Sequence, residues 1–384
     1  MNPLMQLRNH GQSYWLDDLT RQMIASGELA RRIGSEDLGG VTSNPSIFAK
    51  ALQHGDGYAH EIADAAAHGE SPQQIYEDLV TSDVRSACDL LRPVYDRTSG
   101  RDGFASLEVS PHLAFDARAS IEEARRLWRQ VDRPNLFIKI PGTVPGISAI
   151  EELLTEGINI NITLLFSVAR YEAVADAYLR ALERRISSGK PIEGIASVAS
   201  FFLSRIDVLV DELLGQRIVP GAPSMVPDPR DLLGKVAIAN AKLAYRKFRD
   251  ILATRRWKAL AEAGARVQRV LWASTSTKNP RYPDLMYVEP LVGPFTINTM
   301  PEETIAACRE HGHIDRDTVE HDLPEAQRVM ADLERLGISI DFVTTQLENE
   351  GIQKFIKAFD SVLVQLAEER DRAARSDSAA RLVE

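Results

Sequence analysis

The chain has 384 residues, of which 44% are hydrophobic and 26% are charged, so its composition excludes disorder as the main state of the chain. Lys and Arg total 45 against 55 Asp and Glu, and the net charge of −10 argues against non-specific binding to nucleic acid or to an anionic membrane. A small local basic site for a phosphate group stays compatible with this balance.

Cysteine usage and the first residues of the chain predict where the protein works. Cys88 and Cys308 have no CxxC spacing and no nearby histidine, so we expect neither a disulfide framework nor a zinc site. The first fifteen residues lack the apolar core of a signal peptide, and no segment approaches the roughly 20 apolar residues of a membrane span. These features predict a soluble protein of the reducing cytoplasm.

Short runs of β-branched and aromatic residues alternate along the chain with longer amphipathic runs. Helical patterns such as residues 120–131 and 168–186 separate the short runs. Eight alternations of strand and helix predict a parallel sheet with crossover helices, and at this length a single (β/α)8 or TIM barrel with helical insertions. The predicted strands are residues 13–17, 39–44, 104–109, 135–140, 159–165, 195–200, 269–274 and 294–299.

Two long connections and the end of the chain complete the expected domain, which we take as a single catalytic unit over residues 1–384. Residues 45–103 and 201–268 hold several helical patterns but no strands of their own, so we interpret them as decorations of the barrel. Residues 338–343 have a strand-like pattern, which leaves open whether they form a strand or part of the final connection. The amphipathic C-terminal helix after them is expected to pack on the rim of the barrel, and the polar tail from about residue 371 to 384 to be frayed.

Several predicted strands carry polar residues on one face, although strands of a parallel barrel are covered on both faces and should be apolar. Taken singly, each of these residues has a simple structural explanation. Lys139 precedes Pro and Gly and could reach solvent, Asp17 could cap the next helix, and Glu108 could pair with an arginine at the rim. Taken together, polar residues at the carboxyl ends of several strands are typical of a barrel active site. A lysine flanked by two carboxylates and neutral hydrogen-bonding groups fits Schiff-base chemistry at a carbonyl.

Five segments of the chain closely resemble the transaldolases: residues 40–48 (GVTSNPSIF), 136–143 (LFIKIPGT), 156–167, 197–207 and 272–280. With residues 287–294 and 299–304, their order resembles the longer bacterial branch of that family. The resemblance extends from about Trp15 to about Leu366. It implies a TIM barrel that uses a lysine Schiff base and neither a cofactor nor a metal. It also implies a transferase of the non-oxidative pentose phosphate pathway, which moves a dihydroxyacetone unit from sedoheptulose 7-phosphate to glyceraldehyde 3-phosphate, giving erythrose 4-phosphate and fructose 6-phosphate.

The resemblance also assigns roles to residues of this chain. Lys139 matches the Schiff-base lysine, Asp17 and Glu108 match the acid–base carboxylates, and Thr163 matches the threonine that helps to place a catalytic water. For the second phosphate-binding cation we choose Lys278 over Arg281. The residues expected to bind substrate are Asn44, Asn161, Ser200, Phe202, Arg205, Ser274 and Lys278.

Two other functions compete with the transferase. An aldolase of the same barrel family releases free dihydroxyacetone, but such relatives tend to carry Gln and Tyr where this chain has Glu108 and Phe202. A non-catalytic barrel that binds sugar phosphates as a scaffold would have no need of Lys139, Asp17 and Glu108. The expected partners are phosphorylated sugars, with no nucleic acid and no membrane, and the sequence leaves monomer and homodimer open.

Overall fold

A closed barrel of eight parallel strands forms the centre of the computed structural model, which describes residues 2–53, 57–218 and 227–381. Each strand pairs with the next in the chain, and β8 pairs with β1, so the (β/α)8 prediction is confirmed. All eight predicted strands overlap an observed one. The strands are β1 (Gln12–Leu16), β2 (Gly40–Val41), β3 (Phe104–Glu108), β4 (Leu136–Pro141), β5 (Ile160–Leu165), β6 (Ser197–Phe202), β7 (Arg269–Ala273) and β8 (Thr296–Met300).

Strand β2 is much shorter than the predicted run of residues 39–44. A Cβ atom at Gly40 would lie 2.7 Å from the Phe104 carbonyl oxygen and from the Trp15 ring, so the backbone passes close to both neighbouring strands here. The next residues already belong to the start of helix α4 (Pro45–Gln53), because the Asn44 side chain accepts hydrogen bonds from the backbone N–H groups of Ser46 (3.0 Å) and Ile47 (3.2 Å). Asn44 therefore caps a helix instead of extending the strand.

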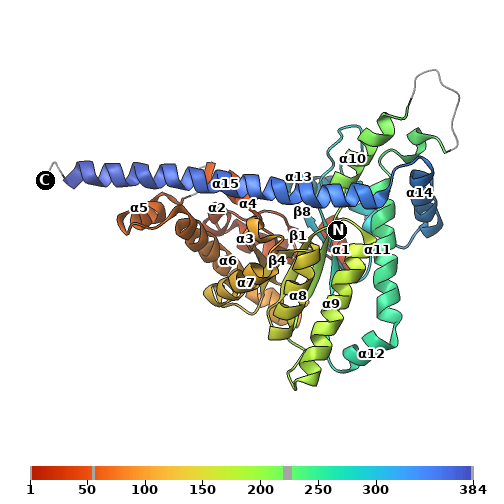
Figure 1. Cartoon of the computed structure of the whole chain (residues 1–384), viewed down its shortest axis with the longest axis horizontal. Helices are drawn as coiled ribbons and strands as arrows, with labels where there is room; N and C mark the ends of the chain where they lie inside the picture. The colour runs from red at the N-terminus through yellow and green to blue at the C-terminus, as the bar shows by residue number, and fades with distance from the viewer. Residues whose placement is uncertain (1, 54–56, 219–226, 382–384) are drawn as a thin grey trace.

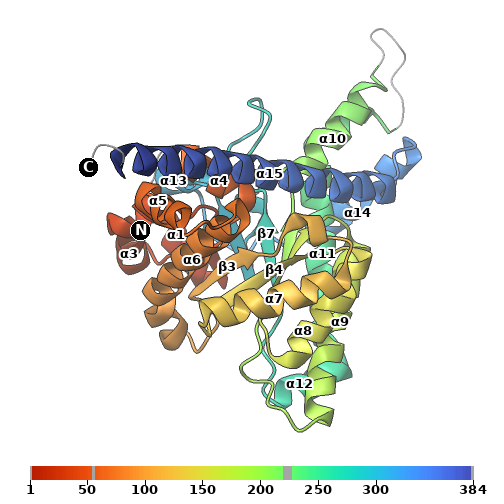
Figure 2. The same ribbon diagram turned by 60° about the vertical axis from the view of Figure 1, so that its left-hand side comes forward.

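Helices surround the barrel, and neighbouring ones pack on each other along its outside (Figure 2). Several begin where a hydroxyl or carboxylate accepts from a free backbone N–H, as Asp116, Thr143 and Ser167 do. The described helices are α1 (Pro3–Asn9), α2 (Arg21–Ala25), α3 (Glu28–Ser35), α4 (Pro45–Gln53), α5 (Ala59–Ala67), α6 (Pro72–Arg97), α7 (Ala117–Val131), α8 (Val144–Glu156), α9 (Val168–Ser187), α10 (Ser204–Gly215), α11 (Val236–Ala253), α12 (Arg255–Glu262), α13 (Glu302–His311), α14 (Leu323–Arg335) and α15 (Ile340–Arg381).

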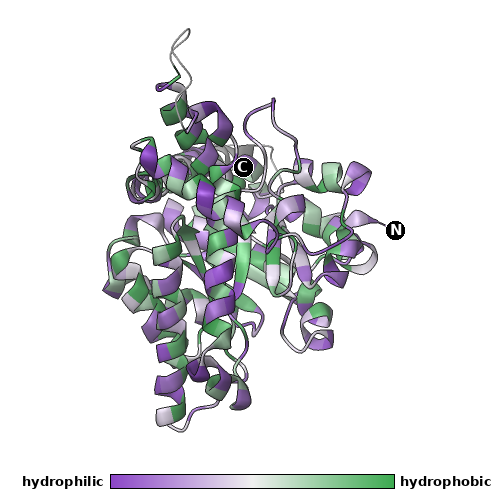
Figure 3. Ribbon diagram, turned by 90° about the vertical axis from the view of Figure 1, so that its right-hand side faces the viewer, coloured by the Kyte–Doolittle hydropathy of each residue, from purple (hydrophilic) through white to green (hydrophobic). Residues whose placement is uncertain are grey.

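In the residues that the structure describes, the two long connections form no strand beyond the end of β6, as the sequence predicts. The first holds α4, α5 and α6, and the second holds α10, α11 and α12. Hydrophobic residues gather on the strands and the inner helix faces, and hydrophilic residues on the outer faces (Figure 3). None of the helices in the described ranges is long and apolar enough to cross a membrane.

The end of the chain is one helix of 42 residues, α15, which crosses the barrel and packs on α4, α5, α6 and α10 (Figure 1). Residues 338–343 therefore form no strand, because α15 begins at Ile340. The segment expected to be frayed from about residue 371 is helical as far as Arg381. Apolar residues at helical spacing, such as Val343, Leu347 and Val362, are buried against the barrel and its insertions.

Side chains inside the barrel change in kind from one end to the other. Near the amino ends of the strands, the rings of Phe104 and Phe137 stack with centroids 4.1 Å apart, and Trp15 lies against both. The following inward positions of β3 and β4 are polar, and Glu108 lies opposite Lys139 in the strand register. The charged groups are thus placed at the carboxyl end, where barrel active sites lie.

Candidate active site

A cavity of about 270 Å³ lies at the carboxyl ends of the strands. Its wall draws on the barrel strands, on α4 and on α15. Of the residues that the sequence analysis assigned to the site, those lining the cavity are Asp17, Asn44, Lys139, Thr163, Ser200, Phe202, Arg205, Ser274 and Lys278. Glu108 lines a smaller cavity beside it, and Asn161 is buried beneath it.

Lys139 is buried near the end of β4, between the strands that carry Glu108 and Asn161. Its Nζ atom lies 3.2 Å from Glu108 Oε2 and donates a hydrogen bond to the Ser43 carbonyl oxygen, at 3.1 Å. The alternative of a lysine that extends into solvent at a strand end is therefore wrong. The amine is thus held in place with little exposure to solvent.

Glu108 is buried, and its partner is the lysine rather than an arginine at the rim. Burial raises the pKa of this carboxyl above its usual value, and the positive charge of Lys139 opposes the rise. Apart from the ion pair, neither carboxylate oxygen accepts a hydrogen bond from the described residues. The group is thus a carboxylate with unused acceptor capacity and a raised affinity for protons.

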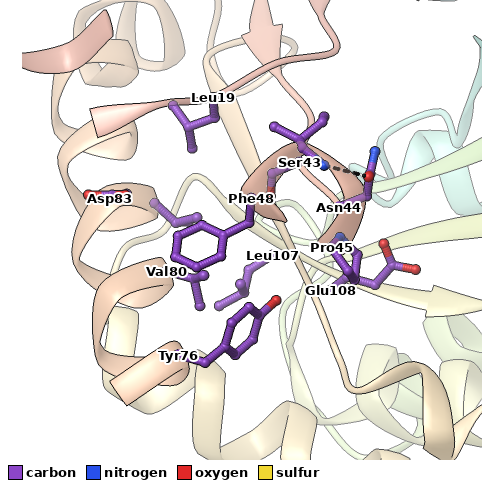
Figure 4. A pocket seen from close by; sticks show the side chains of 12 residues that line it. Leu19, Ser43, Asn44, Pro45, Phe48, Tyr76, Val80, Asp83, Leu107 and Glu108 are labelled. Atoms are coloured by element: carbon purple, nitrogen blue, oxygen red, sulfur yellow. Dashed lines mark hydrogen bonds between the residues drawn. The ribbon is translucent and has the colours of Figure 1, made fainter. Parts of the chain in front are cut away.

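A second, smaller cavity of about 20 Å³ adjoins Glu108, which is room for one water molecule. Figure 4 shows the side chains of Glu108 and Asn44 next to each other at one end of this cavity, and the rings of Phe48 and Tyr76 at the other. Asn44 and Ile47 line both cavities, so they lie between the main cavity and the space next to Glu108.

Asp17 follows β1 and accepts a hydrogen bond of 2.6 Å from the hydroxyl of Thr42. It does not cap the next helix, because Thr20 does so by accepting from the Met23 N–H. Burial raises the pKa of Asp17, and the Thr42 hydrogen bond and the charges of Lys139 and Arg205 oppose that rise. Asp17 is therefore a carboxylate close to the lysine and less acidic than an exposed aspartate.

A hydrogen-bonded layer supports the lysine from below. The Ser200 hydroxyl donates to Asn161 Oδ1 (2.7 Å), and Asn161 Nδ2 donates to the Ser106 hydroxyl (3.1 Å). Asn161 is fully buried and does not line the cavity, so its contacts link strands β3, β5 and β6 to one another. Strand β5 has a bulge after Thr163, where Leu164 adopts φ +59°. The hydroxyl of Thr163 is buried and has no hydrogen-bond partner among the described residues.

Arg205 supplies a positive charge from the first turn of α10. Its guanidinium lies between two aromatic rings, with centroid distances of 5.4 Å to Phe202 and 5.8 Å to Phe355. Burial lowers the pKa of Arg205, opposed by the carboxylates of Asp17 and Glu108, and its Nη1 atom is buried without a hydrogen-bond partner in the described chain. An unsatisfied, desolvated guanidinium on a cavity wall is suited to a phosphate group.

The loop after β7 forms the wall near Arg205. Ser274 adopts a left-handed backbone (φ +56°), and its hydroxyl lies 2.9 Å from the hydroxyl of Ser204. Lys278 lines the cavity and its Nζ donates to the Ser276 hydroxyl, whereas Arg281 is exposed and is not part of the wall. The position of Lys278 is consistent with its choice over Arg281 as the second cation.

Among the wall residues that the sequence analysis did not assign to the site are Lys50, Glu303 and Phe355. Lys50 lies six residues after Asn44, a spacing of about 120° around a helix, so no helical pattern marks it as a neighbour of Asn44. Phe355 belongs to α15, and nothing in its local sequence marks it as a neighbour of Arg205. Over the residues that the structure describes, no three His, Cys, Asp or Glu side chains are grouped so as to hold a metal ion.

Comparison with known proteins adds an independent line of support. A family model described as Transaldolase/Fructose-6-phosphate aldolase matches residues 14–366. A protein of Thermobifida fusca named Transaldolase is 46% identical over 368 residues, which cover 96% of this chain and 98% of that protein. Transaldolase 1 of Streptomyces avermitilis is 48% identical over 364 residues (95% and 94% of the two chains), and Transaldolase 2 of a Nostoc species 45% over 367 residues (94% and 96%).

Proposed function

The chain belongs to the transaldolase/fructose-6-phosphate aldolase family, and we propose that it is a transaldolase acting through a Schiff base on Lys139. The observation that carries the proposal is the placement of Lys139. Its amine is buried, ion-paired with Glu108, and close enough to Asp17 to affect the pKa of that carboxyl, at the base of a polar cavity. A nucleophilic amine with two proton-transfer groups is what imine formation and carbon–carbon cleavage require.

Substrate binding follows from the charges of the cavity wall. The phosphate of a ketose phosphate pairs with the guanidinium of Arg205, and Ser274 and Lys278 assist from the loop after β7. This contact places the far end of the sugar at the mouth of the cavity and its carbonyl carbon near Lys139. The proposed donor is sedoheptulose 7-phosphate and the acceptor glyceraldehyde 3-phosphate, as in the non-oxidative pentose phosphate pathway.

Imine formation begins when the amine of Lys139 loses a proton to Glu108, whose raised pKa makes it a better proton acceptor than an exposed glutamate. The neutral amine attacks C2 of the ketose and forms a carbinolamine. Glu108 then returns the proton to the hydroxyl group of that carbon, which leaves as water. The unpartnered hydroxyl of Thr163 lies on the same wall and is available to hold this water.

Cleavage uses the other carboxylate. Asp17 removes the proton of the C4 hydroxyl, the C3–C4 bond breaks, and its electron pair moves into the protonated imine to give an enamine of three carbons. The aldose phosphate leaves with C4 as its new aldehyde. Attack of the enamine on the acceptor aldehyde, proton return from Asp17, and hydrolysis of the imine release fructose 6-phosphate and restore Lys139.

Phe202 and Glu108 support a transferase rather than an aldolase. The Phe202 ring lies on the cavity wall against Arg205 and 5.3 Å from the Phe166 ring, and it offers no hydroxyl that could protonate the enamine carbon. The enamine then persists until an aldehyde arrives. The two buried free cysteines, Cys88 and Cys308, support a cytoplasmic location for this activity.

Borohydride trapping with fructose 6-phosphate tests the proposal. Reduction should fix a three-carbon adduct on the peptide that contains FIKIPGT, and Lys139→Met should abolish it. Lys50→Met and Lys278→Met are the matched controls, since both lysines line the same cavity and should leave the adduct in place.

Three results would contradict the proposal in different ways. An adduct on Lys50 or Lys278 would reject the assignment of Lys139. Free dihydroxyacetone without an acceptor, at a rate equal to transfer to erythrose 4-phosphate, would identify an aldolase. Saturable binding without any adduct would identify a non-catalytic sugar-phosphate-binding barrel.

A further inference from the structure

A larger cavity, about 480 Å³ in volume, lies at the opposite end of the barrel, near the amino ends of the strands. We call it the floor cavity; its wall includes Gln12, Ser13, Phe104, Ser197, Arg269 and Phe295. The stacked rings of Phe104 and Phe137 close it toward the barrel interior. The floor cavity is thus separate from the site of Lys139, and the transaldolase reaction gives it no role.

Part of the positive charge around the floor cavity is balanced within the protein. The buried guanidinium of Arg269 donates to Asp102 (3.0 Å), to the Ser13 hydroxyl (2.7 Å) and to the Thr296 carbonyl oxygen (2.7 Å). Arg8 pairs with Asp37 at 2.8 Å. These two arginines are structural, and they leave no charge for a ligand.

Three further arginines are not balanced in this way. Arg101 and Arg266 line the floor cavity, and Arg97 lines a smaller adjoining cavity that shares Arg8, Thr98 and Asp102 with it. Arg101 donates to the Thr98 carbonyl and Arg266 to the Gly100 carbonyl, both at 3.3 Å. Within the described part of the chain, none of the three forms an ion pair with a carboxylate.

Helix geometry accounts for only one of these charges. Arg97 lies in the last turn of α6, where a cation interacts favourably with the helix dipole. Arg101 has no such explanation. The Arg266 guanidinium also lies 6.0 Å from the centroid of the Tyr95 ring, a contact that leaves its charge without a carboxylate partner in the described chain. In a chain with a net charge of −10, unbalanced arginines around one cavity point to an anionic ligand.

The mouth of the floor cavity carries a strained aromatic residue. Phe295 adopts a left-handed backbone with φ +57°, and its side chain is 45% exposed. A bulky residue adopts this conformation only where its surroundings hold it there, and such strain concentrates at binding sites. The neighbouring turn is packed against it, since a Cβ atom at Gly11 would lie 2.9 Å from Pro294 Cα. The turn thus presents a fixed ring next to the arginines.

We propose that the floor cavity binds an organic phosphate of nucleotide size. The phosphate lies among Arg97, Arg101 and Arg266, and the ring portion of the ligand packs on Phe295 and on the apolar wall formed by Val267 and Pro294. The volume is within the range of about 300–1,000 Å³ that is usual for small-molecule sites.

The test is titration calorimetry with adenosine 5′-monophosphate, inorganic phosphate and adenosine as separate probes. The double variant Arg97→Ala/Arg101→Ala removes two exposed arginines and should weaken binding of the nucleotide about tenfold or more. The matched control is Arg118→Ala/Arg328→Ala, which removes two exposed arginines that pair with Glu122 and Glu325 elsewhere on the surface. Arg205→Ala separates the floor cavity from the active site and should leave this binding event unchanged.

The proposal is rejected if the nucleotide shows no saturable binding up to about 1 mM, a weak affinity for a specific site. It is also rejected if the control double variant weakens binding as much as the test variant, or if Arg205→Ala alone abolishes binding. Inorganic phosphate that binds as tightly as the nucleotide would overturn the ring contact with Phe295. Phe295→Ala gives an independent measurement, with weaker nucleotide binding and unchanged phosphate binding expected.

Discussion

Replacement of Arg205 by alanine should separate substrate recognition from the stability of the fold. The guanidinium is desolvated between Phe202 and Phe355, and its Nη1 atom has no hydrogen-bond partner in the described chain. A charged donor that is buried and unpartnered destabilises the folded state by about 1–3 kcal/mol, whereas cation–π contact with a ring stabilises it by about 0.5–2 kcal/mol. These effects nearly cancel. We therefore expect the free energy of unfolding of Arg205→Ala to stay within about 1 kcal/mol of the unmodified protein.

The effect on catalysis should be much larger for phosphorylated donors. A guanidinium–phosphate contact contributes about 1.5–3 kcal/mol, so kcat/KM for fructose 6-phosphate should fall about ten- to 150-fold. The loss should nearly vanish with fructose, which has no phosphate. Arg205→Lys is the matched variant, because it keeps the charge and loses the planar fork, and it should recover part of the activity.

The measurements are steady-state transfer to erythrose 4-phosphate with each donor, and urea unfolding of all three proteins. Equal losses with fructose and fructose 6-phosphate would refute the reasoning, since Arg205 would then shape the site rather than bind phosphate. A loss of several kcal/mol in unfolding free energy would refute it in the same way, by making Arg205 a structural residue.

Three further predictions concern other buried groups. Phe202→Tyr places a hydroxyl near the enamine, so the ratio of free dihydroxyacetone release to transfer should rise. The ratio is measured by running the reaction with and without acceptor. An unchanged ratio would mean that Phe202 is only a packing residue. Asp17→Asn should lower kcat about 10²- to 10⁴-fold but leave borohydride trapping intact, because Asp17 acts after the imine has formed. In the unmodified enzyme, burial raises the pKa of Asp17, so the acid limb of the pH–rate profile should lie above the usual aspartate pKa. Burial raises the pKa of Asp207 from 3.8 to about 7, and hydrogen bonds from the Ala237 N–H and the Tyr287 hydroxyl oppose the rise. The protonated carboxyl therefore contributes to the stability of the fold. This contribution is fully present below pH 3.8 and is lost as the pH rises to about 7. Asp207→Asn should remove this part of the pH dependence of urea unfolding, whose slope approaches about 1.4 kcal/mol per pH unit, and an identical slope in both proteins would show that Asp207 titrates normally.

The barrel and the main charged groups of its candidate site could be predicted from the sequence, because both interrupt or follow its local patterns. A strand covered on both faces should be apolar, so Lys139 in β4 and Glu108 in β3 stand out as exceptions. Parallel strands in register then bring such exceptions to one end of the barrel, as the pairing of Glu108 with Lys139 shows. The order of the strands supplies the rest of the geometry, since each pairs with the next.

The parts that escaped prediction depend on contacts between distant segments. Residues 338–343 alternate like a strand, but Ile338 and Val343 are buried while Phe342 is 61% exposed, and the segment becomes the start of α15. The choice between helix and strand is made there by packing on the barrel, not by local preference. Asn161 could be placed at the correct strand end, but whether its amide faces the cavity or bonds to Ser106 and Ser200 depends on three strands at once.

Helix α15 shows why the site extends beyond the strand ends. Its residue Gly351 lies so close to the barrel that a Cβ atom there would be 2.9 Å from Leu164 Cδ2 and 3.3 Å from Arg205 Nη1. The Phe355 ring, one turn further along, contacts the same guanidinium. An arginine at the mouth of a barrel would ordinarily be hydrated. This helix covers one side of the guanidinium, and within the described residues Arg205 Nη1 gains no hydrogen-bond acceptor in exchange. An anion in the cavity would supply the missing acceptor, so we expect the last helix of the chain to favour phosphate binding by Arg205 without itself supplying a charge to the phosphate.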